Sequence, residues 1–246
     1  MKAILTSSLG GAIKKDGKRY PTVLIEENGL LNKIKENWPL NARVLMIAAS
    51  PDDYEKNDSV IDCLRESFPM SGLNYTCFEM CDDRNEGIVE HIDEMDVLIL
   101  IGGHVPTQNK FFGKIELKEK MKDFDGLLIA WSAGSMNCAD IVYAGPELEG
   151  ESIDPTYQRW IPGLGITQTN IFPHFQSLRN EILDGQRLIE DITFEDSMDH
   201  EIIALNDGSY LFIENKKEEL FGDAYSIKDH TIRQICGNGE SVLLRG

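Results

Sequence analysis

The stretch Leu127-Leu-Ile-Ala-Trp-Ser132-Ala-Gly134 decides the expected fold. Residues 127–130 form an apolar run typical of a buried parallel strand, and the residues after Ser132 can begin a helix. The hydroxyl therefore falls on a sharp strand-to-helix turn, where small neighbours let strand and helix approach each other closely. This pattern is a variant of Gly-x-Ser-x-Gly and predicts a nucleophile elbow. A plain turn with an N-capping serine is the alternative that the motif leaves open.

Similar apolar runs precede this stretch, at residues 3–5, 43–48, 74–78 and 97–101. Amphipathic segments with near-helical spacing of apolar residues lie between them, at 23–38 and 59–68. Strands that alternate with helices predict an α/β fold with a mostly parallel, doubly wound sheet. Ligands of such sheets bind beyond the carboxyl ends of the strands, which is where Ser132 and the pair Gly102-Gly103 fall.

The pattern changes near His200, where short strand-like segments joined by tight turns begin. Asn206-Asp207-Gly208 and Lys228-Asp229-His230 fit hairpin connections. We expect this tail to add antiparallel strands to an edge of the sheet. Because no linker or repeat marks a boundary, we expect a single domain over residues 1–246.

Composition excludes several classes of partner. The 246 residues include 42 acidic and 24 basic side chains, which gives a net charge of −18. Nucleic acids and anionic membrane surfaces repel such a chain, so neither is expected to bind it. The first apolar stretch is too short for a signal sequence and no later one could span a bilayer, which predicts a cytoplasmic protein. Five cysteines without Cys-x-x-Cys pairs predict neither a disulfide framework nor a zinc site, and no metal is expected.

A serine nucleophile needs a base within hydrogen-bonding reach and an acid that orients the base. His174 follows Phe172-Pro173 at the end of a strand-like run, so it should lie on the same rim of the sheet as Ser132. His104 is the second candidate, because it directly follows Gly102-Gly103 and could contact substrate. The remaining histidines fall in an acidic helix-like stretch or in the hairpin tail: His91, His200 and His230.

Backbone amides could hold the negative charge that develops on the substrate. The Gly102-Gly103 turn lets the backbone approach a ligand closely, and the residue after the serine begins a helix. Gly103 N–H and Ala133 N–H would then form an oxyanion hole. Paired glycines also occur in ordinary tight turns, so this evidence is weak alone.

In this order and spacing, Ile101-Gly-Gly103, Ala130-Trp-Ser132-Ala-Gly134 and Phe172-Pro-His174-Phe resemble the peptidase E family, which are serine dipeptidases of class S51 and relatives of cyanophycinase. The resemblance spans most of residues 1–215. It implies a three-layer αβα sandwich like that of class I glutamine amidotransferases, with serine in place of the amidotransferase cysteine. It also implies hydrolysis of dipeptides with an N-terminal aspartate, without a metal or organic cofactor.

Carried over by position, the resemblance makes Ser132 the nucleophile, His174 the general base, and Gly103 and Ala133 the oxyanion donors. Family spacing places the third member of the triad at Glu147, where the dipeptidases have aspartate. Glu149, Glu151 and Asp154 are close enough in sequence to replace it. The choice among these four carboxylates stays open.

Recognition of an aspartyl side chain requires a local cation in a chain this acidic. Arg187 lies about where the family places its acid-binding arginine, and Arg179 is the other candidate. Both are expected on a helix from Leu178 to Asp191, where pairing with neighbouring carboxylates is the alternative role. The loop after Gly103 departs from the family's Asn-Thr, since it reads His104-Val-Pro-Thr107.

We therefore predict a cytoplasmic serine exopeptidase that hydrolyses small dipeptides, with N-terminal aspartate as the preferred first residue. A cyanophycinase-like or other amidase or esterase is the alternative within enzymes. A binding or regulatory relative that lost catalysis is the alternative outside them. The oligomeric state, including a homodimer, stays open.

Overall fold

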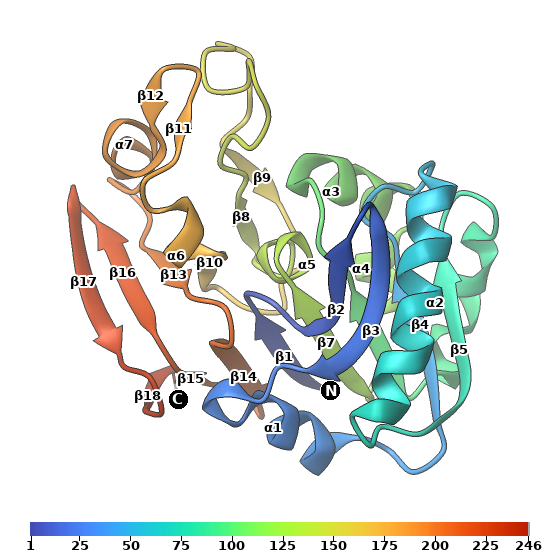
Figure 1. Cartoon of the computed structure of the whole chain (residues 1–246). Helices are drawn as coiled ribbons and strands as arrows, with labels where there is room; N and C mark the ends of the chain where they lie inside the picture. Colours follow the sequence, from blue (N-terminus) through green and yellow to red (C-terminus); the bar gives the residue numbers. More distant parts are fainter. Residues whose placement is uncertain (246) are drawn as a thin grey trace.

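The computed structural model describes residues 1–245. Its centre is an eight-stranded sheet (Figure 1). The strand order is β18-β15-β14-β1-β7-β6-β4-β5. The parallel part contains β1 (Lys2–Thr6), β4 (Ala42–Ile47), β5 (Tyr75–Cys81), β6 (Val97–Leu100) and β7 (Leu127–Trp131). Three antiparallel strands extend it: β14 (Tyr210–Glu214), β15 (Lys217–Phe221) and β18 (Ser241–Arg245).

The middle strands of this sheet are apolar on both faces. Every residue of β6 is buried, as are residues 127–130 of β7 and 44–47 of β4. Continuous apolar strands of this kind belong to parallel sheets that are covered on both sides. This confirms the expected mixed α/β architecture with a mostly parallel central sheet flanked by helices.

The longest helix, α2 (Tyr54–Met70), includes the predicted helix at 59–68. Its N-cap Asp53 accepts a hydrogen bond from Lys56 N at 3.2 Å, and Ile61, Leu64 and Phe68 are buried. The helix packs on β5 and on the hairpin of β2 (Gly10–Lys15) and β3 (Lys18–Leu24), beside it in Figure 1.

The other helices are short. They are η1 (Glu27–Gly29), α1 (Leu30–Asn37), η2 (Glu86–Glu94), α3 (Val105–Lys114), α4 (Leu117–Lys120), α5 (Ala133–Met136), α6 (Phe175–Leu178), η3 (Leu188–Thr193) and α7 (Phe194–Asp196). Two small hairpins complete the set: β8 (Ile141–Tyr143) with β9 (Trp160–Pro162), and β11 (Ile182–Leu183) with β12 (Gln186–Arg187).

A second sheet lies beside the first and has the order β10-β13-β16-β17. It contains β10 (Asn170–Phe172), β13 (Ile202–Leu205), β16 (Ala224–Lys228) and β17 (Thr231–Cys236). The C-terminal strands are therefore divided between two sheets, whereas the sequence predicted additions to one edge. The chain passes from the second sheet to the first through residues 206–209, between β13 and β14.

Two predicted helices are corrected by the structure. The first residues of the segment 23–38 belong to the end of strand β3, and only η1 and α1, residues 27–37, are helical. The segment 178–191 is no helix: it contains the β11–β12 hairpin and the start of η3. Asp184 and Gly185 have φ of 52° and 79°, which fits the tight hairpin turn and is incompatible with a continuous helix.

No helix within residues 1–245 combines the length and the apolar character needed to cross a bilayer. In the same part of the chain, no three or more His, Cys, Asp or Glu side chains are grouped to hold a metal ion.

Candidate active site

Ser132 occupies a strained turn between β7 and α5, with φ of 51° and ψ of −123°. A non-glycine residue at positive φ is uncommon and is held there by its surroundings. Here Ser132 N donates to Thr6 O at 3.1 Å, and Ser132 O accepts from Met136 N at 3.0 Å. A Cβ on Gly134 would lie 2.3 Å from Leu100 O, so the helix passes β6 too closely for any side chain there. The turn has the geometry expected of a nucleophile elbow.

The Gly102-Gly103 loop lies directly against this turn. A Cβ on Gly102 would lie 3.0 Å from Ser132 Cβ and 2.9 Å from the Trp131 ring, and one on Gly103 would lie 2.5 Å from Ala49 Cβ. Only glycine fits at both positions. Within residues 1–245, the amide groups of Gly103 and Ala133 donate no hydrogen bond to another residue.

His174 is fixed by a network that joins three segments distant in sequence. Its Nδ1 lies 2.8 Å from Asp207 Oδ1, and its main-chain N–H donates to Ser7 Oγ at 2.7 Å. Ser7 Oγ in turn donates to Asp207 Oδ1 at 2.7 Å. His174 itself has a left-handed backbone with φ of 56°. Burial raises the pKa of Asp207, but hydrogen bonds from His174 and Ser7 outweigh it, so the pKa lies below its usual range.

Ser132 and His174 line the same cavity, which has a volume of about 320 Å³. The rest of its lining is mainly apolar and includes Met136, Phe172, Leu178, Leu183 and Leu188. Two acidic residues, Glu147 and Glu181, also line it. Within the described residues the Ser132 hydroxyl makes no hydrogen bond. Catalytic hydrogen bonds are often long in the absence of substrate and shorten when it binds. The structure therefore brings the predicted nucleophile and base to one cavity.

Glu147 shares this cavity but contacts a different partner. Its Oε1 accepts a hydrogen bond from Val105 N at 3.3 Å, at the start of α3. Loss of solvation of the carboxylate beside the cavity is the main cause that raises the pKa of Glu147 to about 7, although the residue as a whole is exposed. Glu151 raises the pKa further, and Val105 N–H and His174 lower it. The carboxylate that hydrogen-bonds to the imidazole is instead Asp207, which the sequence analysis placed only in a hairpin turn.

The other carboxylates considered for the triad also have separate contacts. Glu151 lies 2.9 Å from His104 Nε2 and accepts from the main chain of residues 147 and 148. Asp154 accepts from Thr156, and Glu149 is exposed. His104, the proposed substrate contact, is thus held between Glu151 and Thr107, whose Oγ1 lies 2.8 Å from its Nδ1.

The two arginines predicted to bind substrate lie outside the cavity wall. Arg187 forms a hydrogen-bonded ion pair with Asp191, which is its neighbour four residues later. Arg179 is exposed, and its guanidinium lies 5.8 Å from the Phe175 ring centroid. Neither contact directs a cation toward Ser132.

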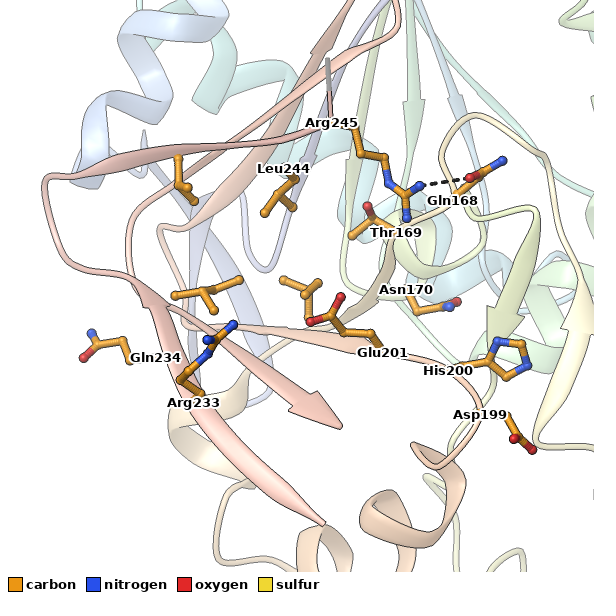
Figure 2. Close-up of a pocket in the computed structure, with 13 residues that line it drawn as sticks. Gln168, Thr169, Asn170, Asp199, His200, Glu201, Arg233, Gln234, Leu244 and Arg245 are labelled. Carbon is orange, nitrogen blue, oxygen red and sulfur yellow. Dashed lines mark hydrogen bonds between the residues drawn. The ribbon is translucent and has the colours of Figure 1, made fainter. Parts of the chain in front are cut away.

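A larger, open hollow of about 710 Å³ lies at the second sheet (Figure 2). It is lined by residues of β17 and β18 and by the segments 168–170 and 199–201, and contains neither Ser132 nor His174. Arg245 in its wall donates to Gln168 at 2.9 Å. The smaller cavity therefore carries the candidate active site, although it is not the largest.

Comparison with known proteins bears on the family and the fold. Residues 27–221 match the profile of peptidase family S51. A search of curated proteins finds no match. Among solved structures, a Listeria monocytogenes EGD-e protein described as a candidate peptidase E is similar with a TM-score of 0.59 and 12% identity, over 95% of this chain and 98% of that one. At this identity the structural likeness supports the fold.

Proposed function

Because the chain belongs to peptidase family S51 and is a serine peptidase, we propose that it hydrolyses small peptides with Ser132 as nucleophile and His174 as general base. This proposal depends on one observation: Ser132, on its strained turn, lines the same cavity as His174. His174 Nδ1 is engaged by Asp207, which leaves Nε2 to take the hydroxyl proton. Ser132 would then attack the scissile carbonyl carbon.

The third group of the proposed triad is Asp207. An acid in this role accepts a hydrogen bond from the imidazole and stabilises the cation that forms during attack. The 2.8 Å contact with Nδ1 and the lowered pKa of Asp207 both support it. Glu147, the acid implied by family spacing, remains the competing assignment, and its contact with Val105 N supports a role in the cavity wall.

Gly103 N–H and Ala133 N–H are the proposed oxyanion donors. Ala133 directly follows Ser132, and Gly103 follows Gly102, which lies against Ser132; neither amide donates to another residue in the part of the chain that the structure describes. Preorganised amides of this kind stabilise the tetrahedral intermediate, whose oxygen carries the negative charge. His174 would pass its proton to the leaving amine, and water activated by the same imidazole would release the acyl group.

The small cavity supports exopeptidase action on short peptides. Glu147 and Glu181 in its wall could hold a protonated α-amino group, while the apolar side chains contact the rest of the N-terminal residue. An N-terminal aspartate, which the family resemblance implies, remains the proposed preference. Its carboxylate needs a cation that Arg187 and Arg179 do not supply in their present contacts.

The proposal is tested with a panel of Asp-Leu, Gly-Leu and β-aspartyl-leucine, and free leucine is measured after incubation. We expect hydrolysis of Asp-Leu by the wild type and none above background by Ser132→Ala, with similar melting temperatures for both. Turnover retained by Ser132→Ala would remove this serine from the mechanism. Faster release from Gly-Leu than from Asp-Leu would contradict the aspartyl preference, and preference for the β-linked peptide would favour cyanophycinase-like specificity.

A further inference from the structure

A second hollow lies on the other flank of the nucleophile. It has a volume of about 160 Å³ and is floored by the carboxyl ends of β1, β6 and β7, through Leu9, Ile101 and Trp131. The β2–β3 hairpin and α2 cover it and contribute Arg19 and Lys56. Figure 1 shows this hairpin beside α2. Open α/β sheets bind their ligands at this edge.

The hollow is separated from Ser132 by a single glycine. Gly102 lines it, and a Cβ on Gly102 would lie only 3.0 Å from Ser132 Cβ. Trp131, which also lines it, directly precedes Ser132 in the chain. A substrate group about one residue away from the scissile carbonyl could therefore enter this hollow.

Both cations in the wall lack an acidic partner. Arg19 donates from Nη1 to Ser59 Oγ at 3.1 Å, and neither Arg19 nor Lys56 has a carboxylate oxygen within 4.0 Å in residues 1–245. The chain has 42 acidic groups for 24 basic ones, yet no carboxylate in the described part of the chain lies against either of these two half-buried cations. Two cations without a carboxylate partner in residues 1–245 thus line the hollow that Gly102 and Trp131 separate from Ser132, and both are available to a ligand.

We propose that Arg19 and Lys56 form a subsite for a substrate carboxylate, an inference that rests on the peptidase function proposed above. Arg19 offers planar paired donors and Lys56 a compact charge, and both suit a carboxylate. The surrounding apolar side chains, including Val60 and Leu64, reduce solvent screening of that contact. The overall charge of −18 repels anionic peptides, so local cations are needed to bind them.

Two carboxylates of a dipeptide could fill this subsite: the side chain of an N-terminal aspartate or the C-terminal carboxylate. Four peptides distinguish them, namely Asp-Leu, Asn-Leu, Asp-Leu-amide and Asn-Leu-amide. The variants are Arg19→Gln and Lys56→Gln. The matched control is Arg43→Gln, since Arg43 lies near the amino end of β4, at the opposite edge of the sheet.

We expect Arg19→Gln and Lys56→Gln each to lower kcat/KM for Asp-Leu about tenfold or more, mainly through KM, because a charge-assisted hydrogen bond is lost. Arg43→Gln should have no effect. If the subsite holds the aspartyl side chain, the two variants will match the wild type on Asn-Leu. If it holds the terminal carboxylate, they will match it on Asp-Leu-amide.

Binding of the same four peptides to Ser132→Ala, measured by calorimetry, separates this inference from the catalytic proposal. We expect Asp-Leu to bind Ser132→Ala and to bind about tenfold more weakly once Arg19→Gln is added. Equal effects of Arg19→Gln on all four peptides, no effect on Asp-Leu, or no binding of Asp-Leu would overturn the subsite. Turnover by Ser132→Ala would instead overturn the catalytic proposal and leave the binding result interpretable.

Discussion

At the scale of single residues, Asp207 is the carboxylate within hydrogen-bonding distance of the His174 imidazole, and it is therefore our proposed third member of the triad. His174 and Asp207 are 33 residues apart, and Ser7, which hydrogen-bonds to both, is 167 residues before His174. Spacing from Ser132 suggested Glu147, because that reasoning follows the chain and cannot see contacts between distant segments. The only local signal at 206–208 was a hairpin turn, which is a common structural feature with no catalytic meaning.

The first prediction concerns the acid of the triad. Asp207→Asn should lower kcat by about 10²- to 10⁴-fold with little change in KM, because the amide favours the wrong imidazole tautomer. Glu147→Gln should have a smaller effect, since it keeps the cavity shape. Steady-state kinetics with Asp-Leu gives both values, and a larger loss of kcat in Glu147→Gln would reverse the assignment.

The second prediction concerns the pH dependence of stability. Glu147 has a folded pKa of about 7 against an ordinary value of 4.5, so between these values the folded state keeps a proton that the unfolded chain has released. The free energy of unfolding contributed by this group therefore falls as pH rises from about 4.5 to about 7, by less than the full shift implies, because Glu147 is exposed and solvent screens its charge. Glu147→Gln should lack this fall and gain stability relative to the wild type between pH 4 and pH 8. Urea unfolding at both pH values measures it, and a constant difference between the two proteins would contradict it.

At the scale of elements, the central strands and α2 could be predicted from the sequence because their buried residues are apolar and recur with the spacing of a strand or a helix. It missed the β2–β3 and β11–β12 hairpins, although each carries an Asp-Gly turn, at Asp16-Gly17 and Asp184-Gly185. All four residues have positive φ. The strands on either side of these turns are charged and mostly exposed, so they bury few side chains. Their sequences therefore lack the alternation of apolar and polar residues by which a strand is recognised.

The third prediction tests the close approach of α5 to β6. Gly134→Ala places a methyl group 2.3 Å from Leu100 O and should destabilise the protein by about 1–3 kcal/mol or more. Gly113→Ala is the control, because nothing lies within 4 Å of its Cβ position in α3. That control should be neutral or stabilising by up to about 1 kcal/mol. Urea unfolding compares the two, and equal stabilities would mean that the elbow is more loosely packed than the structure indicates.

At the scale of the whole molecule, the site is assembled where two sheets meet. Ser132 follows β7 of the central sheet, whereas His174 follows β10 of the second sheet. Buried Glu218 of β15 joins the two, because its oxygens accept hydrogen bonds from Thr167 and Thr169, each at 2.7 Å, just before β10. The sequence could not predict this junction, since Glu218 stands between Lys217 and Glu219 in a short strand and looks like a solvated charge.

The fourth prediction follows from this junction. Glu218→Ala removes the acceptor of two buried hydroxyl groups and should destabilise the protein by about 3 kcal/mol. Glu219→Ala, on the adjacent residue of the same strand, should cost less than about 1 kcal/mol because Glu219 is partly exposed and, within residues 1–245, its side chain accepts one hydrogen bond, from Ser241. Urea unfolding of both variants measures the difference, and similar values would show that Glu218 does not hold the sheets together.

The reactivity of Ser132 is tested most directly by treating the protein with a small serine-reactive phosphonate and measuring the mass of the peptide that contains this residue. An activated hydroxyl on a strained turn should form one phosphonyl adduct at Ser132, faster than any other serine in the chain. Asp207→Asn should slow the labelling. An unmodified peptide, under conditions that fully label a control serine hydrolase, would contradict the assignment of Ser132 as the nucleophile.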